Sequence, residues 1–429
     1  MHSEYTEKQI HNAWCLYDWG SSAFSTTVEA AVLPVFFEQV LAASLPGNRP
    51  TVYWGYANAL SLLIAALMAP ILGSIADYTG SKKKLLAIFA SIGILATALM
   101  VFLGSGAWLA ALVLFFFGAI GLGASYIFYD ALLPHITREG NIDYISSKGY
   151  AMGYLGGGIL LAANMWMIQG VWPGSSLGPR FSFLTVAIWW AIFTLPLLRR
   201  VPEPPANTEG LGQGLNPVKA GLKRLRQTFS HLQAYRELFK FLVAFWLYND
   251  GIGTIIKMAT IYGSEIGIGM TDLIGALLLT QFVGIPFSLA FGKFSKQVGT
   301  KRAIMIGLGW YALIAVMGYF MSQPWHFWAL AIAVGMVQGG TQALSRSLFG
   351  LMAPKARSAE FFGFYDISSK FAGILGPFLF GLVGQIMGSS RLSIVALLIF
   401  FVGGIILLAG VDEGEGIRIA ERENQLANG

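Results

Sequence analysis

Charged side chains inside long apolar runs are the residues of this chain best suited to do chemistry. Asp18 and Glu29 lie in one run near the start, and Asp250 and Lys257 lie in another near the middle. A charge at the centre of a membrane helix costs roughly 2.5–3.5 kcal/mol unless it is paired or hydrated. Residues kept at this cost bind charged solutes, exchange protons or form ion pairs.

The spacing of the charges indicates how they meet. Aligning residues 16–17 with the same Leu-Tyr pair at 247–248 puts Lys257 about one turn from the level of Glu29. We therefore predict that Glu29 and Lys257 approach each other across a central cavity and couple proton or substrate charge to a conformational change. A permanent ion pair that fixes helix register is the alternative. Asp250 is a second candidate proton site, with an interhelical hydrogen bond as the alternative.

Two aspartates near the ends of apolar runs are candidates for a gate. Asp18 and Asp130 lie at the same level of the predicted bundle, where Arg346 or Lys148 could pair with them. Helix capping or snorkelling of the charges explains the same positions without a gate.

Polar and aromatic side chains could line the cavity between these charges. Gln338, Thr341, Gln342 and Ser345 recur every three or four residues and so share one helix face. Aromatic walls with polar tips suit amino acids or other amphiphilic organic ions, although core or interface packing explains any one aromatic residue equally well. The candidates near the charges are Tyr17, Trp19, Tyr129, Trp246, Tyr248 and the neighbouring Asn249.

The composition is that of an integral membrane protein. Of 429 residues 55% are hydrophobic and 12% are charged, and the mean hydropathy is +0.62. Runs of about 20 residues, long enough to cross the hydrocarbon layer, predict an all-α fold with twelve transmembrane helices, six in each half. The predicted spans are 13–41, 53–77, 84–104, 108–133, 147–170, 181–198, 238–262, 272–294, 302–322, 325–349, 361–386 and 391–410.

The residue inventory argues against enzymes and metal proteins. The single cysteine, Cys15, excludes an internal disulfide and a multi-cysteine metal site. The five histidines have no metal-ligand spacing, and there is no Walker loop for ATP. We therefore expect no enzymatic activity, no metal and no cofactor, and an ion gradient as the energy source.

The cations predict the orientation in the membrane. Only Arg49, Arg180 and Arg391 fall on one side, with Lys257 inside the membrane, and the other 24 of 28 Lys and Arg residues lie on the opposite side or at its edge. By the positive-inside rule that side, with both termini, is the cytoplasm. The net charge of +6 then requires no nucleic-acid partner.

The chain divides into an N-terminal half at 1–198, a linker at 199–237, a C-terminal half at 238–410 and a cytoplasmic tail at 411–429. The linker begins with a Pro/Gly-rich run that we expect to be flexible. After Pro217 a basic amphipathic helix is predicted, either on the inner leaflet or packed against the bundle. Its apolar positions are Val218, Leu222, Leu225, Phe229 and Leu232, beside Lys219, Lys223, Arg224 and Arg226.

A short loop pattern occurs twice. GSIADYTGSKK at 73–83 is repeated as GKFSKQVGTKR at 292–302, and Ile-Ser-Ser-Lys at 145–148 is repeated at 367–370. In the second loop Lys296 stands where the first has an aspartate, so we expect the turn there but not the same charge pairing. Duplicated halves in a hydrophobic chain are how alternating-access transporters are built, with the binding site between the repeats.

The first loop resembles the signature G-x-x-x-D-x-x-G-x-[KR]-[KR] of the major facilitator superfamily. Gly73 and Gly80 would permit a close helix approach and a tight turn. Asp77 would be held by Lys82, Lys83 and Lys84 or by a helix N-terminus, forming a latch that favours one access state. A solvated cationic turn that serves only topology is the alternative.

Three segments resemble the vacuolar amino-acid effluxer branch, also called the unknown major facilitator group: LYDWGSSAFSTTV at 16–28, FYDALLPHI at 128–136 and YNDGIGTI at 248–255. The compact length is similar to that of the bacterial members. This resemblance implies a major facilitator carrier for a small organic solute, with amino acids as the first substrate.

We therefore expect a proton-coupled alternating-access carrier that works as a monomer in a bacterial inner membrane. A multidrug or amphiphile exporter is the first alternative, favoured by the aromatic residues and disfavoured by Glu29 and Lys257, which suit a zwitterion. A non-transporting receptor or lipid-remodelling membrane protein is the second.

Overall fold

The computed structural model describes residues 5–47, 49–208, 216–230, 232–265, 267–388 and 390–426, and every regular element within these ranges is a helix. The first half begins with a span made of α1 (Glu7–Ala23), η1 (Phe24–Val32), α2 (Leu33–Phe36) and η2 (Phe37–Leu41). It continues with α3 (Arg49–Thr79), α4 (Lys82–Leu99), η3 (Met100–Phe102), α5 (Trp108–Ile136), α6 (Ile142–Trp166), η4 (Met167–Val171) and α7 (Leu177–Arg200).

The second half repeats this plan, with one span divided into α13 and α14 and another divided into α15 and α16. It contains α9 (Arg236–Glu265), α10 (Met270–Val298), α11 (Thr300–Tyr319), α12 (Pro324–Met352), η6 (Lys355–Arg357), α13 (Ser358–Phe371), α14 (Leu375–Met387), α15 (Ser390–Ala396) and α16 (Leu398–Ala409). The break between α13 and α14 contains Gly373 at a φ of +100°, a conformation that glycine adopts without a steric penalty.

Eleven helices within the described ranges are long and apolar enough to cross a membrane. The remaining predicted span, 238–262, corresponds to α9, which is 30 residues long but carries Asn249, Asp250 and Lys257. These polar residues reduce its apolar character, so its length and its packing against α13 and α16 identify it instead. The predicted all-helical membrane fold is confirmed.

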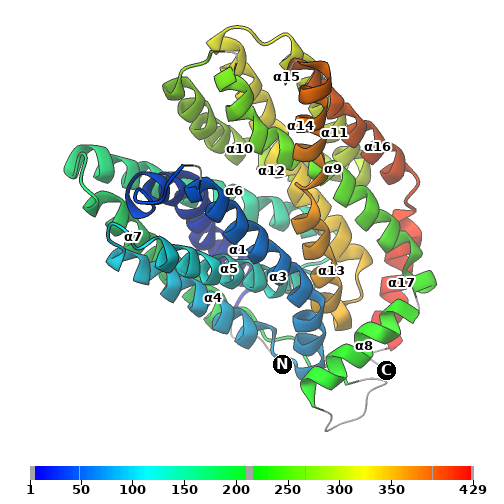
Figure 1. The fold of residues 1–429 in the computed structure, drawn as a ribbon. Coiled ribbons are helices and arrows are strands. Elements are labelled where there is room, and N and C mark those ends of the chain that lie inside the picture. The colour runs from blue at the N-terminus through cyan, green and yellow to red at the C-terminus, as the bar shows by residue number, and fades with distance from the viewer. Residues whose placement is uncertain are drawn as a thin grey trace.

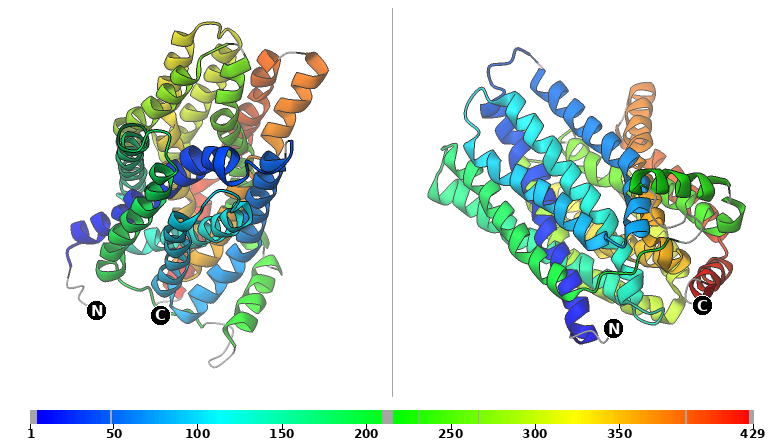
Figure 2. Two further views of the ribbon diagram at one scale, coloured as in Figure 1. Left: turned by 60° about the vertical axis from the view of Figure 1, so that its left-hand side comes forward. Right: turned by 90° about the horizontal axis from the view of Figure 1, so that it is seen from below.

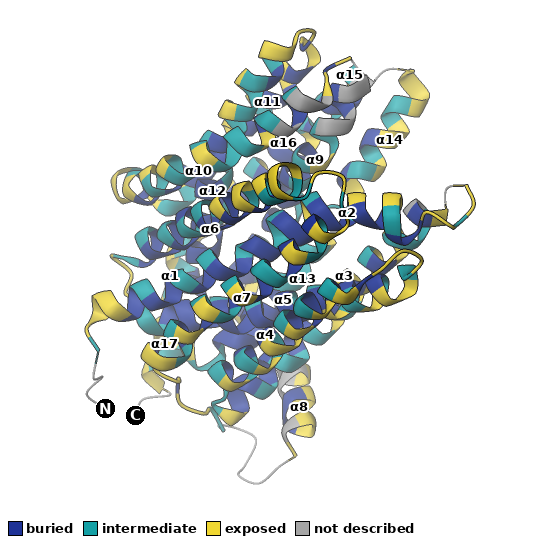
Figure 3. Ribbon diagram, turned by 90° about the vertical axis from the view of Figure 1, so that its left-hand side faces the viewer, coloured by how far each residue is buried: buried dark blue, intermediate teal, exposed yellow. Residues whose placement is uncertain are grey.

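The two halves form a V in Figure 1. Both chain ends lie where the halves meet, which we call the closed end, and the helices diverge toward the opposite, open end in Figures 1 and 2. Buried residues concentrate in the middle of the bundle, where α1, α5 and α13 lie (Figure 3). Apolar residues such as Leu67 and Ile399 are more than half exposed on the outer faces, as expected for helices that contact lipid.

The repeated loops bring helices of opposite halves together at the closed end. A β-carbon on Gly73 of α3 would lie 2.0 Å from the carbonyl oxygen of Ala359 in α13. Gly292 of α10 meets α6 in the same way, since a β-carbon there would lie 2.7 Å from a serine hydroxyl. Gly80 and Gly299, at the turns, have φ angles of +61° and +89°. The repeat therefore corresponds to two equivalent close helix contacts.

The linker is better anchored than its composition predicts. Residues 202–208 have no regular structure, but the backbone N–H of Asn207 donates to the carbonyl oxygen of Asp77 at 2.8 Å. Glu203 accepts the backbone N–H of Lys83 at 3.0 Å. The remainder of the Pro/Gly-rich run, 209–215, lies outside the described residues.

The predicted amphipathic helix is present as α8 (Pro217–Ser230), followed by η5 (Leu232–Tyr235). Its small residues Ala220 and Gly221 pack on α3, whereas Val218 and Leu222 are about half exposed. Packing against the bundle and contact with a membrane surface are therefore compatible. The side chains of Arg224, Leu225, Phe229 and Leu232 lie outside the described residues. The predicted tail also folds, as α17 (Glu413–Leu426), and packs against α12.

Gly73→Ala should destabilise the protein, because the added β-carbon meets a backbone carbonyl that cannot rotate away. Overpacking of this kind costs about 1–3 kcal/mol. Gly309→Ala in α11 is the matched control, since nothing lies within 4 Å of its added β-carbon. Thermal unfolding of the two purified variants checks this, and equal melting temperatures would contradict the close contact of α3 with α13.

Candidate functional site

A polar cavity of about 390 Å³ lies between the two halves. Glu29 and Asp130 of the first half and Asn249, Lys257 and Gln342 of the second half are predicted site residues that line it. Further polar wall residues come from both halves and include Ser25, Asn58, Ser61, Tyr126, Tyr150 and Ser369. The cavity therefore offers hydrogen-bonding groups and charges of both signs.

Glu29 and Lys257 both line the cavity next to irregular helical backbone. Glu29 lies in η1, a π-helical stretch of a kind often found at functional sites. Lys257 extends to the helix break, where a β-carbon on Gly373 would lie 2.8 Å from its ammonium nitrogen. Among the described side chains these two share the wall without forming an ion pair with each other. Their joint action on a ligand or proton stays a prediction.

Arg346 of α12 is the centre of a charge cluster at the closed end. Its Nη1 lies 3.0 Å from Asp130 Oδ1 and 3.5 Å from Asp18 Oδ2. Its Nε and Nη2 donate to the hydroxyl and the carbonyl oxygen of Ser146 at 2.9 and 2.8 Å. Because the arginine belongs to the second half and its partners to the first, the cluster joins the halves as a gate would.

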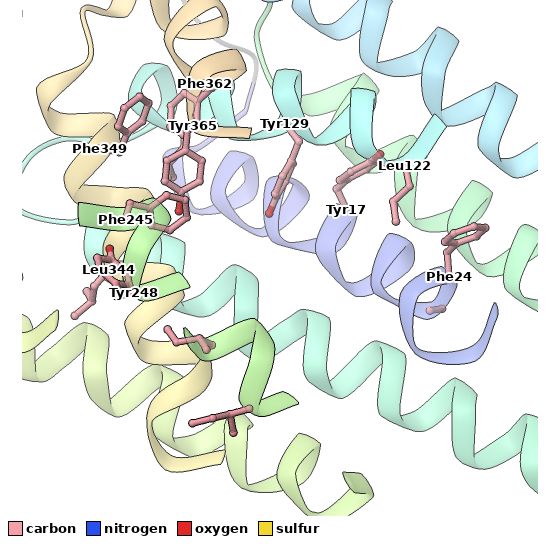
Figure 4. Packing of buried hydrophobic residues seen from close by; sticks show 14 of the residues in the cluster. Tyr17, Phe24, Leu122, Tyr129, Phe245, Tyr248, Leu344, Phe349, Phe362 and Tyr365 are labelled. Carbon is pink, nitrogen blue, oxygen red and sulfur yellow. The ribbon is translucent and has the colours of Figure 1, made fainter. Parts of the chain in front are cut away.

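Aromatic rings enclose this cluster. Tyr126 and Tyr129 donate their hydroxyls to the carboxylate of Asp18 at 3.0 and 2.8 Å. Trp14 stacks on Tyr129 at 4.3 Å between ring centroids, and the guanidinium of Arg346 lies 4.9 Å from the Trp14 ring. Figure 4 shows Tyr129 among the packed aromatic residues of the core. Exclusion of water by these rings strengthens the ion pairs that they surround.

Asp77 of α3 has the two kinds of partner that the sequence predicts, a lysine and a helix N-terminus, and its role as a latch stays a prediction. Its buried carboxylate pairs with Lys82 at 2.6 Å. It also accepts the backbone N–H groups of Ala359 and Glu360, at 3.2 and 2.8 Å, in the first turn of α13. A carboxylate at a helix N-terminus is favourable, and this one ties the two halves together. Lys83 was also expected to pair with Asp77, but its backbone N–H donates to Glu203 of the linker.

Asp250 of α9 has a similar role within the second half. It accepts the backbone N–H groups of Gly373, Leu375 and Gly376 at 2.8, 3.1 and 2.9 Å. It thereby caps α14 at the helix break and is not part of the cavity wall. This geometry corresponds to the interhelical hydrogen bond rather than to an accessible proton site.

Most of the predicted cavity residues do not line the cavity, contrary to the expectation. Besides Asp250, the predicted residues that lie outside the wall are Tyr17, Asp18, Trp19, Tyr129, Trp246, Tyr248, Gln338, Thr341 and Ser345. Tyr17 donates to a serine of α5 at 2.5 Å, and Tyr248 shares a hydrogen bond of 2.6 Å with a serine of α12. Trp19 stacks on a tryptophan of α7 at 6.0 Å between centroids. Gln338 lies one turn from Gln342 but outside the wall. Packing directs the hydroxyls of Tyr17 and Tyr248 toward neighbouring helices of their own half. It keeps Trp19 and Gln338 outside the wall.

The sequence prediction misses an ion pair on the wall. Lys370 of α13 pairs with Asp366 one turn earlier, and both side chains line the cavity. Both residues lie within the predicted span 361–386, but neither was predicted as a site residue. The sequence feature that could have drawn attention to this lysine is the Ile-Ser-Ser-Lys repeat, in which Lys370 corresponds to Lys148. Lys148 itself donates to Asn12 at 2.5 Å and belongs neither to the wall nor to the Arg346 cluster.

Asp143 of α6 is a second carboxylate that sequence reasoning misses. It accepts hydrogen bonds from Thr300 Oγ1 at 2.6 Å and from Ser347 Oγ at 2.5 Å, both in the second half. Lys296, at the aspartate position of the second loop, is exposed. The second loop therefore obtains its carboxylate from the facing helix, which sequence comparison of the two loops cannot reveal.

Comparisons with known proteins agree with this architecture. The family model described as "Vacuole effluxer Atg22 like" matches residues 49–421. The chain is 38% identical to the Bacillus subtilis "Uncharacterized MFS-type transporter YxiO", over 99% of this chain and all of that protein. It is 25% identical to autophagy-related protein 22-1 of Aspergillus terreus, over 86% of this chain and 76% of that protein.

Solved transporters have the same fold. The proton:xylose symporter XylE aligns with a TM-score of 0.73 at 14% identity, over 97% of this chain and 98% of that chain. The human organic anion transporter MFSD10 aligns with a TM-score of 0.72 at 12% identity, over 94% of this chain and 100% of that chain. The chain is thus a multi-pass membrane transporter rather than an enzyme, and it belongs to the Atg22-like vacuole effluxer family with a major facilitator fold.

Proposed function

We propose that this protein is a secondary active transporter that moves amino acids by alternating access, coupled to protons. One observation carries the proposal: a cavity between the halves has carboxylate and ammonium groups on its wall. Glu29 suits the amino group of a zwitterion, and the wall lysines Lys257 and Lys370 suit its carboxylate. A half-buried carboxyl such as Glu29 can also exchange a proton. The vacuole effluxer description of the family supports a small-solute carrier.

The closed end is assigned to the cytoplasm in this proposal. Exposed cations gather there, including Lys219, Lys223 and Arg226 of α8, and the positive-inside rule favours that orientation. The bacterial relative supports an inner membrane. One chain supplies the whole cavity wall, so a monomer suffices. With this orientation the structure corresponds to an outward-facing state.

Asp130 is the proposed connection between the cavity and the gate. It lies on the cavity wall and also pairs with Arg346 at the closed end. Inward opening must separate Arg346 from Asp130, Asp18 and Ser146 and release Asp77 from α13. Removing one partner of a buried pair costs roughly 3–5 kcal/mol, so ligand binding or protonation has to offset a comparable amount.

An exporter of cationic amphiphiles is the second candidate. Aromatic wall residues favour it, because their faces attract organic cations. They include Phe115, Tyr126, Tyr150, Phe245 and Tyr365, and Figure 4 shows Phe245 beside Tyr365, with 4.3 Å between their ring centroids. The presence of two lysines on the same wall disfavours a purely cationic ligand.

Glu29→Gln should abolish amino-acid-driven proton movement, because the amide cannot exchange a proton or balance an ammonium group. The protein would be reconstituted in liposomes that contain a pH dye and screened with the twenty amino acids and with cationic amphiphiles. Glu38→Gln is the matched control, since Glu38 is exposed near the other end of the same span. Unchanged proton flux in Glu29→Gln would reject the coupling role, and flux with amphiphiles alone would favour the second candidate.

Arg346→Gln should open the closed end, because it removes the charge that both aspartates share. A cysteine in place of Ser147, in a Cys15→Ser background, reports this opening at the contact of α6 with Gly292. We expect labelling by a membrane-impermeant maleimide to rise by roughly tenfold or more, from a buried-pair cost of about 3–5 kcal/mol. Arg236→Gln, at an exposed arginine, is the control. Equal labelling rates in the two variants would exclude the gate.

A further inference from the structure

We propose that Lys370 is the binding residue for the carboxylate of the transported solute, and that this carboxylate replaces Asp366 as the ion-pair partner of Lys370. The inference deepens the proposed function and rests on it for the identity of the solute. It specifies the ligand class as small organic carboxylates, with zwitterionic amino acids the members that match the whole wall.

The first argument is the position of the Asp366–Lys370 pair. Both side chains line the cavity and remain partly accessible, with 16% and 11% of their surfaces exposed. An ammonium group in a membrane cavity needs a counter-ion, and Asp366 supplies one when no ligand is bound. A ligand carboxylate of the same charge and geometry can take its place without leaving Lys370 unpaired.

The second argument is that Lys370 bridges the halves. It belongs to α13 of the second half, but its ammonium nitrogen lies at Gly123 of α5 in the first half, where a β-carbon would be only 3.1 Å away. Gly123 also lines the cavity. A ligand held by Lys370 therefore contacts both halves, and such a position is needed for a ligand to influence their rearrangement.

The third argument comes from the other charges that face this part of the cavity. The backbone donors at the helix break are already occupied by Asp250, so the anion-binding groups there are the side chains of Lys370 and Lys257. Asp130 pairs with Arg346, and Asp366 pairs with Lys370 when no ligand is bound. Among the described wall residues Glu29 is therefore the carboxylate that we assign to a ligand ammonium. A zwitterion satisfies both ends without changing the net charge of the cavity.

A structural ion pair between residues one turn apart is the competing explanation, and the two explanations predict different signs. If the pair only supports α13, Lys370→Met and Asp366→Asn both lower the stability of the protein and its affinity for the ligand. If Asp366 competes with the ligand for Lys370, Lys370→Met weakens binding of carboxylates whereas Asp366→Asn strengthens it.

The test is a binding titration of the full-length purified protein. The ligands are the twenty amino acids, their methyl esters, their N-acetyl derivatives and lactate. For the amino acids that bind, we expect Lys370→Met to weaken affinity by roughly 10- to 100-fold, the range for losing a hydrogen bond to a charged group. The methyl esters should bind the wild-type protein more weakly than the corresponding amino acids by a similar factor. The Asp366→Asn variant should bind amino acids more tightly than the wild type.

Lys148→Met is the matched control, because it removes the lysine of the other Ile-Ser-Ser-Lys segment, which lies outside the cavity. Its amino-acid affinity should equal that of the wild type. Thermal unfolding and size-exclusion profiles establish that the variants are folded. The ester comparison and Asp366→Asn still decide the question if Lys370→Met does not fold.

The outcomes separate this inference from the proposed function. Amino-acid transport with unchanged affinity in Lys370→Met, or equal losses in Lys370→Met and Asp366→Asn, would overturn the inference and leave the function standing. Binding of lactate but of no amino acid, lost in Lys370→Met, would overturn the amino-acid function and support the inference. Absence of binding by every carboxylate would overturn both.

Discussion

The closed end depends on one buried guanidinium. Arg346 crosses from the second half into a pocket built by α1, α5 and α6, where Asp18, Asp130 and Ser146 satisfy it. A charge buried in this way must be fully partnered, and all of the partners belong to the other half. Separation of the two halves at this end would leave the arginine or the aspartates unpaired, so the cluster stabilises the closed arrangement that the structure shows.

The duplicated loops add two further contacts between the halves, with the same close glycine packing and different electrostatics. In each copy a glycine lets a helix approach the opposite half closely, at Gly73 against α13 and at Gly292 against α6. In the first copy the carboxylate comes from the loop itself, as Asp77, and caps α13. In the second it comes from the facing helix, as Asp143. The two copies therefore share the close helix packing but differ in which helix provides the carboxylate.

Three charged residues of the cavity wall are associated with irregular helices. Glu29 lies in π-helical η1, and Lys257 and Lys370 both lie beside the break between α13 and α14. Irregular backbone is tolerated at membrane depth where it lines a cavity or where other groups bind its polar atoms, and Asp250 does the latter at this break. Asp250 thus stabilises the break between α13 and α14, and both lysines lie next to this break.

The sequence by itself determined the membrane class and the all-helical fold, because hydropathy is a signal carried by each long run. It also predicted the two halves and the partners of Asp77, because cation placement and repeated loops are local signals. The resemblance carried by the signature loop and by the Tyr-Asp-Trp segment led to the correct family. Only the tertiary structure decided which polar residues face the cavity. The aligned pair Tyr17 and Tyr248 turned toward serines of neighbouring helices, and Lys370 reached the wall. Residue spacing defines a helix face, but the rotation of that helix against its neighbours, which decides whether the face meets lipid, protein or cavity, is set by packing across the whole bundle.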